Sequence, residues 1–330
     1  MKRVFKRAAQ FVAALLLILV ISVPLTIALA RPGTPPPIAA VENGSVAAGP
    51  DRPLPPYRPF VARDGASLAY RAYPGLPGGG VAVVVHGSSG TSAIVHPLAL
   101  HLAAGGITVY APDLRGHGRS GKLGDVDHLG QYQEDMTDLA WHLRDVYPRE
   151  KVILVGHSSG GSVALRTASE RSAEMWDGFL ALSPFIAPGA PFSRPDEGGW
   201  TDVSVPRIVA ISIANGFGVT AFNGLPVMAM AVPQNAGADR ARVYSYRLLT
   251  SLNLPRDWAP ALGAIRKPTI VLIGEADELF YADAYKDEIG RVNHAIDVQT
   301  LRGVGHMAML WDPAALDRGR EAAQRLLARN

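Results

Sequence analysis

The chain has 330 residues, enough for one large α/β domain or for two ordinary domains. It contains no cysteine, which excludes disulfides, cysteine-ligated zinc and thiol catalysis. The formal net charge is only +3, and no run of Lys or Arg follows residue 10, so the sequence gives no sign of a nucleic-acid-binding surface.

Residues 1–30 have the pattern of a targeting segment. The basic start MKRVFKR precedes an uncharged stretch from Ala8 to Ala30, and about 20 residues are enough to span a bilayer as a helix. Basic residues on the N-terminal side predict a single-pass membrane anchor with the rest of the chain outside the cytoplasm. Two alternatives stay open: a signal peptide cleaved after Ala30, which would leave a secreted or periplasmic protein, and a buried core helix.

Residues 31–59 carry a run of prolines, which cannot form a helix or a central strand, so we predict an extended linker. Beyond it, strands and helices are expected to alternate. The predicted elements up to residue 183 are a hairpin over 61–73, strands over 81–85, 107–111, 152–155 and 178–182, and helices over 94–104, 131–146 and about 159–171. Such alternation requires a mostly parallel sheet with helices on both faces.

The alternation breaks between residues 184 and 267, where prolines interrupt short apolar stretches. We predict an inserted cap there, lying over a core made of residues 60–183 and 268–330. Ordinary core helices remain the alternative for any one cap stretch. The core pattern resumes with strands over 269–273 and 295–301 and helices over 282–292 and 313–327.

The most informative stretch follows the 152–155 strand. Gly156-His157-Ser158-Ser159-Gly160 leads at once into a helical pattern, which is G-x-S-x-G between a strand and a helix. So tight a turn needs nearly side-chain-free residues two before and two after the serine, and glycines stand at both positions. Ser158 would be held above the N-terminus of a helix as a candidate nucleophile, although a glycine-rich turn without chemistry also fits this stretch alone.

A serine nucleophile needs a base, and the base needs a carboxylate to orient it. Asp277 and His306 follow Ser158 in the order nucleophile, acid, base, and each comes just after a predicted strand. The carboxyl ends of parallel strands share one edge of a sheet, so the three residues are expected to meet there. Glu275 and Asp113 are rival acids.

Other residues near the strand ends have predicted supporting roles. The histidines that also follow strands or flank the serine, namely His86, His117 and His157, are expected to be structural. Acyl transfer further needs donors for an oxyanion. The backbone N–H groups of Ser159, at the start of the helix, and of Ser88, in the loop after the 81–85 strand, are the candidates.

These stretches together closely resemble the α/β-hydrolase family, in particular its monoacylglycerol-lipase-like and serine-aminopeptidase-like branch. The matching stretches are VVVHGSSG (83–90), APDLRGHGRSG (111–121), VGHSSGG (155–161), IGEAD (273–277) and GVGHM (303–307). The resemblance covers about residues 60–330. It implies an α/β-hydrolase fold with Ser158 as nucleophile, Asp277 as acid, His306 as base, and Ser88 and Ser159 as oxyanion donors, with no metal and no cofactor.

The expected activity is therefore hydrolysis of carboxylic esters through an acyl-enzyme, on a small acyl ester or a lipid such as a monoglyceride or lysophospholipid. A peptidase or amidase is the alternative, and it would need acidic groups to hold a substrate amine; Asp196, Glu197 and Asp202 form the only local cluster in the cap. A non-catalytic binding protein on the same scaffold is a further alternative. Haloalkane cleavage is disfavoured because it needs a carboxylate nucleophile.

Overall fold

The computed structural model describes residues 2–36, 53–195, 199–232 and 236–328. Its centre is an eight-stranded sheet of order β1-β2-β4-β3-β5-β6-β10-β11. Strand β2 pairs antiparallel with β1 and β4, and the other pairs are parallel. The strands are β1 (Tyr57–Val61), β2 (Ser67–Tyr73), β3 (Val81–Val85), β4 (Thr108–Pro112), β5 (Val152–His157), β6 (Gly178–Leu182), β10 (Thr269–Gly274) and β11 (Ile296–Leu301).

Helices cover both faces of this sheet, because alternate side chains of its strands are buried on opposite faces. In β3, Val81, Val83 and Val85 join one buried cluster and Ala82 and Val84 the other. The helices of the core are α3 (His96–Ala104), α4 (Gln131–Val146), α5 (Ser159–Ser169), α9 (Ala282–Val292) and α10 (Pro313–Leu327), with short 3-10 turns η1 (Arg171–Met175) and η3 (Met307–Leu310). Residues of α3 and α10 pack in the second cluster, and those of α4, α5 and α9 in the first. The predicted mostly parallel sheet with helices on both faces is confirmed.

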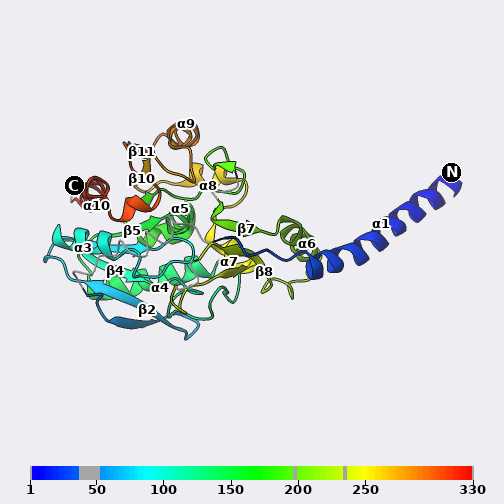
Figure 1. Ribbon diagram of the computed structural model, residues 1–330, viewed down its shortest axis with the longest axis horizontal. Coiled ribbons are helices and arrows are strands. Elements are labelled where there is room, and N and C mark those ends of the chain that lie inside the picture. Colours follow the sequence, from blue (N-terminus) through cyan, green and yellow to red (C-terminus); the bar gives the residue numbers. More distant parts are fainter. Residues whose placement is uncertain (1, 37–52, 196–198, 233–235, 329–330) are drawn as a thin grey trace.

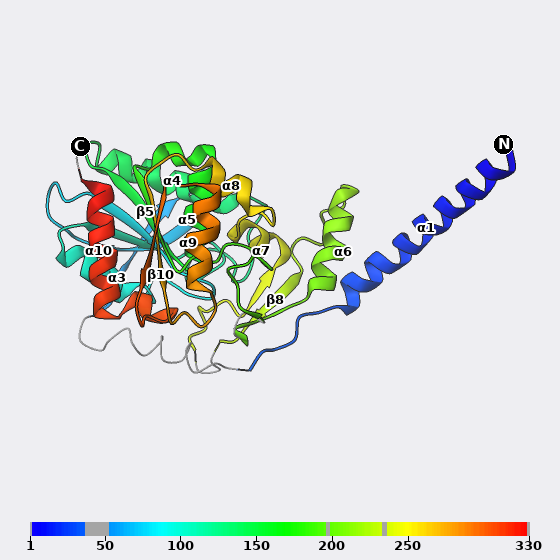
Figure 2. The same ribbon diagram turned by 90° about the horizontal axis from the view of Figure 1, so that it is seen from above.

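The 184–267 segment contains a small antiparallel sheet that the sequence reading missed. Its elements are β7 (Thr201–Val203), α6 (Val205–Gly216), β8 (Pro226–Met230), β9 (Val243–Ser245), α7 (Tyr246–Leu252) and α8 (Trp258–Ala264), with strand order β7-β8-β9. Strands of three to five residues are too short for a period-two pattern to stand out. In both views, α6, α7 and β8 lie between the core and the N-terminal helix (Figures 1 and 2).

The N-terminal helix α1 (Lys2–Leu29) extends away from the core and meets α6 at its C-terminal end (Figure 1). The Arg207 side chain of α6 donates to the carbonyls of Ile27 and Ala28, at 2.8 and 3.4 Å, and Ile27 is buried against α6. These bonds satisfy carbonyls that the helix end leaves without an internal partner.

The structure contradicts the predicted membrane anchor. Within the described residues, no helix combines the length and apolar character that a membrane span requires. The prediction of a single-pass anchor is therefore wrong, and so is the extracytoplasmic location derived from residues 1–30. The anchor was predicted from the length of the apolar run and its basic flank, whereas the end of α1 packs against α6. Most of the predicted 31–59 linker lies outside the described residues.

Gly156, in β5, lies where a side chain would collide with the backbone of α5, and we expect this glycine to be needed for stability. A Cβ on Gly156 would lie 2.0 Å from the carbonyl oxygen of Gly160, whereas one on Gly290, inside α9, would meet nothing within 4 Å. Gly156→Ala should lower the free energy of unfolding by at least about 2 kcal/mol through overpacking. Gly290→Ala, the matched control, should raise it by up to about 1 kcal/mol. Urea unfolding measures both, and equal effects would contradict this account.

Candidate active site

Ser158 occupies a strained turn between β5 and α5. Its backbone has φ 55° and ψ −121°, a conformation that residues with a side chain rarely adopt. A Cβ on Gly160 would lie 2.5 Å from the carbonyl oxygens of Val85 and His86, so only glycine lets the turn pass so close to the end of β3. The turn therefore places Ser158 directly before the first helical residue, where unsatisfied N–H groups favour negative charge.

His306 and Asp277 form a buried pair. Nδ1 of His306 lies 2.9 Å from Oδ2 of Asp277, and the exposed fractions of the two residues are 1% and 0%. The other carboxylate oxygen of Asp277 accepts from the backbone N–H groups of Leu279 and Phe280, at 2.9 and 3.0 Å. Burial alone would raise the pKa of Asp277, but the charge and hydrogen bond of His306, together with the N–H of Leu279, hold it below its usual value.

The loop that carries His306 is held from several sides. The backbone N–H of His306 donates to Oε2 of Glu278 at 2.8 Å, and the His306 carbonyl accepts from Nε2 of His157 at 3.0 Å. The ring of Trp200 lies edge-on to the imidazole, with centroids 5.6 Å apart. Glu278 and Trp200 were not singled out from the sequence; Glu278 follows the acid by one residue, and nothing in the sequence marks Trp200.

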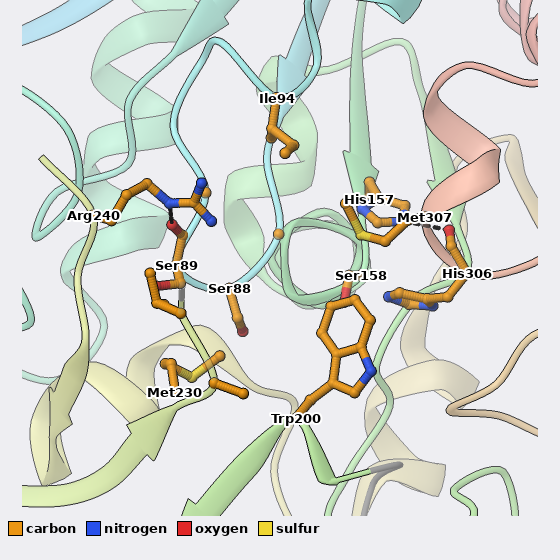
Figure 3. Close-up of a pocket in the computed structure, with 14 residues that line it drawn as sticks. Ser88, Ser89, Ile94, His157, Ser158, Trp200, Met230, Arg240, His306 and Met307 are labelled. Carbon is orange, nitrogen blue, oxygen red and sulfur yellow. Dashed lines mark hydrogen bonds between the residues drawn. The ribbon is translucent and has the colours of Figure 1, made fainter. Parts of the chain in front are cut away.

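Nε2 of His306, the other ring nitrogen, is buried and has no hydrogen-bond partner among the described residues. His306 and Ser158 line one pocket, with the indole of Trp200 beside both of them (Figure 3). Met230 and the loop that carries Ser88 lie on the other side of this pocket. The structure thus brings Ser158 and His306 to one cavity and places Asp277 behind the imidazole. The cavity volume is about 50 Å³, which is small.

The two candidate oxyanion donors lie beside the serine. Ser159 is the first residue of α5, and the side-chain oxygens of Ser88 and Ser159 are 2.5 Å apart. A Cβ on Gly87 would lie 2.9 Å from Cβ of Ser158, so this glycine lets the loop after β3 approach the serine. The loop also carries Ser89, whose N–H donates to the Tyr244 hydroxyl at 2.5 Å.

Neither rival acid takes the place of Asp277 beside His306. Asp113 accepts from the backbone N–H groups of Ser92 and Arg119, at 2.7 and 2.9 Å, so it closes its own turn. Glu275 is exposed to solvent. Nε2 of His86 accepts from the Leu114 N–H at 3.0 Å.

His117 pairs with a residue of the 184–267 segment, since its Nε2 lies 2.6 Å from the Tyr244 hydroxyl. Of the acidic cluster, Asp196 and Glu197 lie outside the described residues, and Asp202 accepts from the N–H of Gly33 at 3.0 Å. Within the described ranges, no group of three or more potential ligand side chains is arranged to hold a metal ion.

A comparison with models of known protein families shows to which family the chain belongs. The family model described as "Serine aminopeptidase, S33" (Hydrolase_4) matches residues 78–310. The chain belongs to this family of α/β-hydrolases. The resemblance inferred from the sequence is therefore confirmed.

Individual relatives match only part of this chain. A monoacylglycerol lipase of Mycolicibacterium smegmatis is 34% identical over 106 residues, which is 32% of this chain and 38% of the relative. The human monoglyceride lipase is 33% identical over 104 residues, 31% of this chain and 34% of the relative. The chain therefore matches little more than a third of the length of these curated relatives.

Solved structures support the same fold. A soluble variant of monoglyceride lipase from Saccharomyces cerevisiae aligns with a TM-score of 0.59 and 16% identity, over 84% of this chain and 98% of that one. The α/β hydrolase GrgF from Penicillium sp. sh18 aligns with a TM-score of 0.61 and 17% identity, over 83% and 99%. At such identities the likeness concerns the fold alone.

The buried His157 should make stability depend on pH. Burial, and secondly the charge of His306, lowers the pKa of His157 from 6.5 to about 3. Below pH 6.5 the unfolded chain binds a proton here that the folded chain does not, so the contribution of neutral His157 is fully present above pH 6.5 and is lost as the pH falls towards 3.

The measurement is urea unfolding of the wild type and His157→Gln at several pH values between 6.5 and 4.5. Within that window, stability of the variant should fall less steeply, by up to about 1.4 kcal/mol per pH unit for the one proton removed. Parallel curves, whatever their separation, would show that His157 does not stay neutral in the folded protein.

Proposed function

We propose that the protein is a serine hydrolase that cleaves carboxylic esters through an acyl-enzyme at Ser158. The observation that carries this proposal is the state of the His306 imidazole. One ring nitrogen is held by the buried Asp277 carboxylate, and the other has no partner among the described residues and belongs to the pocket that Ser158 lines. Such an imidazole is oriented to accept a proton from a hydroxyl in that pocket.

In the first half-reaction, Ser158 Oγ bonds to the ester carbonyl carbon while its proton passes to Nε2 of His306. The carbonyl oxygen becomes an oxyanion that the N–H groups of Ser88 and Ser159 are proposed to bind. The carbon–oxygen bond to the alcohol then breaks, and His306 gives its proton to the departing oxygen. The ionised Asp277 stabilises the imidazolium that exists between these two proton transfers.

In the second half-reaction, a water molecule attacks the acyl carbon and gives a proton to Nε2 of His306. The bond to Ser158 Oγ breaks, the oxygen recovers that proton, and the carboxylic acid leaves. The site needs no net change in charge over the cycle, because His306 accepts and returns one proton in each half.

The same proposal treats residues 184–267 as a cap over a core of residues 60–183 and 268–330. Five residues of this segment support it, since they line the pocket together with Ser158: Trp200, Met230, Ala231, Val232 and Arg240. A cap over the serine would exclude water from the oxyanion and strengthen every electrostatic interaction there.

An ester is a better fit to this pocket than the amino terminus of a peptide. Holding a protonated amine requires a carboxylate close by, and none of the described residues that line the pocket is Asp or Glu. The described member of the predicted acidic cluster, Asp202, is bonded to Gly33. The names of the matched relatives, monoacylglycerol and monoglyceride lipases, agree with an acyl ester as substrate.

The central test is a comparison of Ser158→Ala and Asp277→Asn with the wild type on p-nitrophenyl butyrate. Loss of the nucleophile should lower kcat by at least about 10³-fold, and the wrong histidine tautomer in Asp277→Asn by roughly 10⁴-fold. The circular dichroism spectrum should show that both variants fold. Activity that survives in a folded Ser158→Ala would exclude the acyl-enzyme mechanism, and a wild type with no turnover of any ester would favour a binding protein. Aminoacyl p-nitroanilides, assayed in parallel, test the peptidase alternative.

Trp200 is expected to limit the length of the acyl chain. A cavity of about 50 Å³ accepts only a short chain unless the cap opens, and Trp200 lies across it beside Ser158 (Figure 3). Trp200→Ala should shift the preference towards longer p-nitrophenyl esters, because each methylene newly buried adds about 0.8 kcal/mol, roughly fourfold in kcat/KM. The readout is the ratio of kcat/KM for octanoate to that for acetate. A ratio that does not change would show that Trp200 does not bound the acyl site.

A further inference from the structure

Arg240 is the only permanently charged side chain among the described residues that line the Ser158 pocket. It comes from the loop between β8 and β9. Its guanidinium extends towards the pocket beside Ser89, on the side away from His306 (Figure 3). The proton transfers of the proposed reaction run through His306, so they do not use this group.

The hydrogen bonds of Arg240 leave most of its donors available. Nε donates to the carbonyl of Ser89, and a guanidinium has five N–H groups in all. In the described part of the chain, neither terminal nitrogen has a hydrogen-bond or ion-pair partner. Asp239, the preceding residue, contributes only through its charge at longer range.

Arg240 is partly buried, and a guanidinium partly removed from water without a carboxylate beside it is energetically unfavourable. Burial lowers the pKa of Arg240 below its usual value, with the charges of Tyr244 and Asp239 opposing the shift, but arginine keeps its proton in proteins. The nearby His86 and His117 add no balancing negative charge. Burial first, and the charge of Arg240 among the further causes, lower the pKa values of both histidines, so they stay neutral.

We propose that Arg240 binds an anionic oxygen group, a carboxylate or a phosphate, carried by the ester substrate. This inference rests on the proposed esterase activity and gives the substrate a chemical class, an acyl ester that bears a negative charge. The planar fork of an arginine matches both kinds of anion with two parallel hydrogen bonds. The same positive charge would repel the amino group of a peptide, in agreement with the choice of ester over aminopeptide.

A purely structural role for Arg240 makes a different prediction. Its bond to Ser89 joins the 184–267 segment to the loop of Ser88, as do the bonds of Ser89 to Ala241 and Tyr244. If Arg240 only positioned this loop, removing it would impair the oxyanion donors and slow every ester alike. A substrate-binding role affects charged esters more than neutral ones.

The experiment compares kcat/KM for two pairs of esters, each with a charged and a neutral member. The acyl-side pair is the p-nitrophenyl monoester of glutaric acid against p-nitrophenyl valerate. The alcohol-side pair is a monoacylglycerol phosphate against the corresponding monoacylglycerol. The variants are Arg240→Met and Arg240→Lys, and the matched control is Arg242→Met, which removes the same charge from the same loop at a residue that does not line the pocket.

In at least one pair, the wild type should prefer the charged ester. Arg240→Met should lower the charged-to-neutral ratio of kcat/KM roughly 10- to 100-fold, mainly through KM, as expected for loss of a charge-assisted hydrogen bond. Arg240→Lys should restore part of the ratio, and Arg242→Met should leave it unchanged. An effect confined to the first pair places the anion on the acyl side, and one confined to the second places it on the alcohol side; either supports the proposal.

An unchanged charged-to-neutral ratio in Arg240→Met would overturn it. If both kcat/KM values fall equally, Arg240 only positions the loop, and if neither value falls, Arg240 does not contribute to either ester's turnover. Both leave the esterase proposal intact, because the neutral esters report on that proposal separately. Absence of turnover of all four esters by the wild type would instead defeat the esterase proposal itself.

Discussion

The site depends on keeping a carboxylate ionised where no water reaches it. Asp277 is fully buried, and an isolated carboxylate there would take up a proton. Its oxygens are instead satisfied by the imidazole of His306 and by the two N–H groups that follow the acid in the chain. These bonds hold the pKa of Asp277 low and also fix which nitrogen of His306 faces the pocket. Burial of the acid and orientation of the base are therefore one arrangement.

The second constraint is the geometry of the turn that carries Ser158. A positive φ at a residue with a side chain is unfavourable by about 1–3 kcal/mol, and the turn tolerates it because the glycines on either side let three strand and helix ends meet without clashes. The close approach of Gly87 brings the loop of Ser88 against the same serine. Strain at one residue is thus stabilised by the packing of the sheet around it, and the sheet edge gains a prominent hydroxyl beside the N-terminus of a helix.

How far the sequence predicts this structure depends on how local the signal is. The buried strands and long helices were predicted almost to the residue, as with β3, α4 and α9, because their periodicity is carried by neighbouring side chains. Ser158, Asp277 and His306 are expected to lie close together because the carboxyl ends of parallel strands share one edge of a sheet. The spacing of these residues in the chain does not by itself predict that they are close. At that edge, Ser158 and His306 line one pocket and Asp277 lies behind the imidazole, while their catalytic roles are proposals.

Features formed by long-range packing were not predictable. The antiparallel sheet β7-β8-β9 has strands too short to show a period, and the contact of Trp200 with His306 joins residues more than 100 positions apart. Nothing in the sequence marks Arg240, which lines the pocket because residues 240 and 241 contact Ser89. The membrane-anchor prediction was wrong because an apolar run with a basic flank does not show what the helix packs against.

The most direct measurement of the central claim is labelling by a fluorophosphonate, followed by peptide mass spectrometry. An activated serine displaces fluoride and keeps the phosphonyl group, whereas an ordinary serine does not react. The account predicts a single modified residue, Ser158, with a labelling rate that falls at least about 100-fold in His306→Gln. Modification of another serine, or equal labelling of Ser158 in both proteins, would contradict the proposal that His306 activates this hydroxyl.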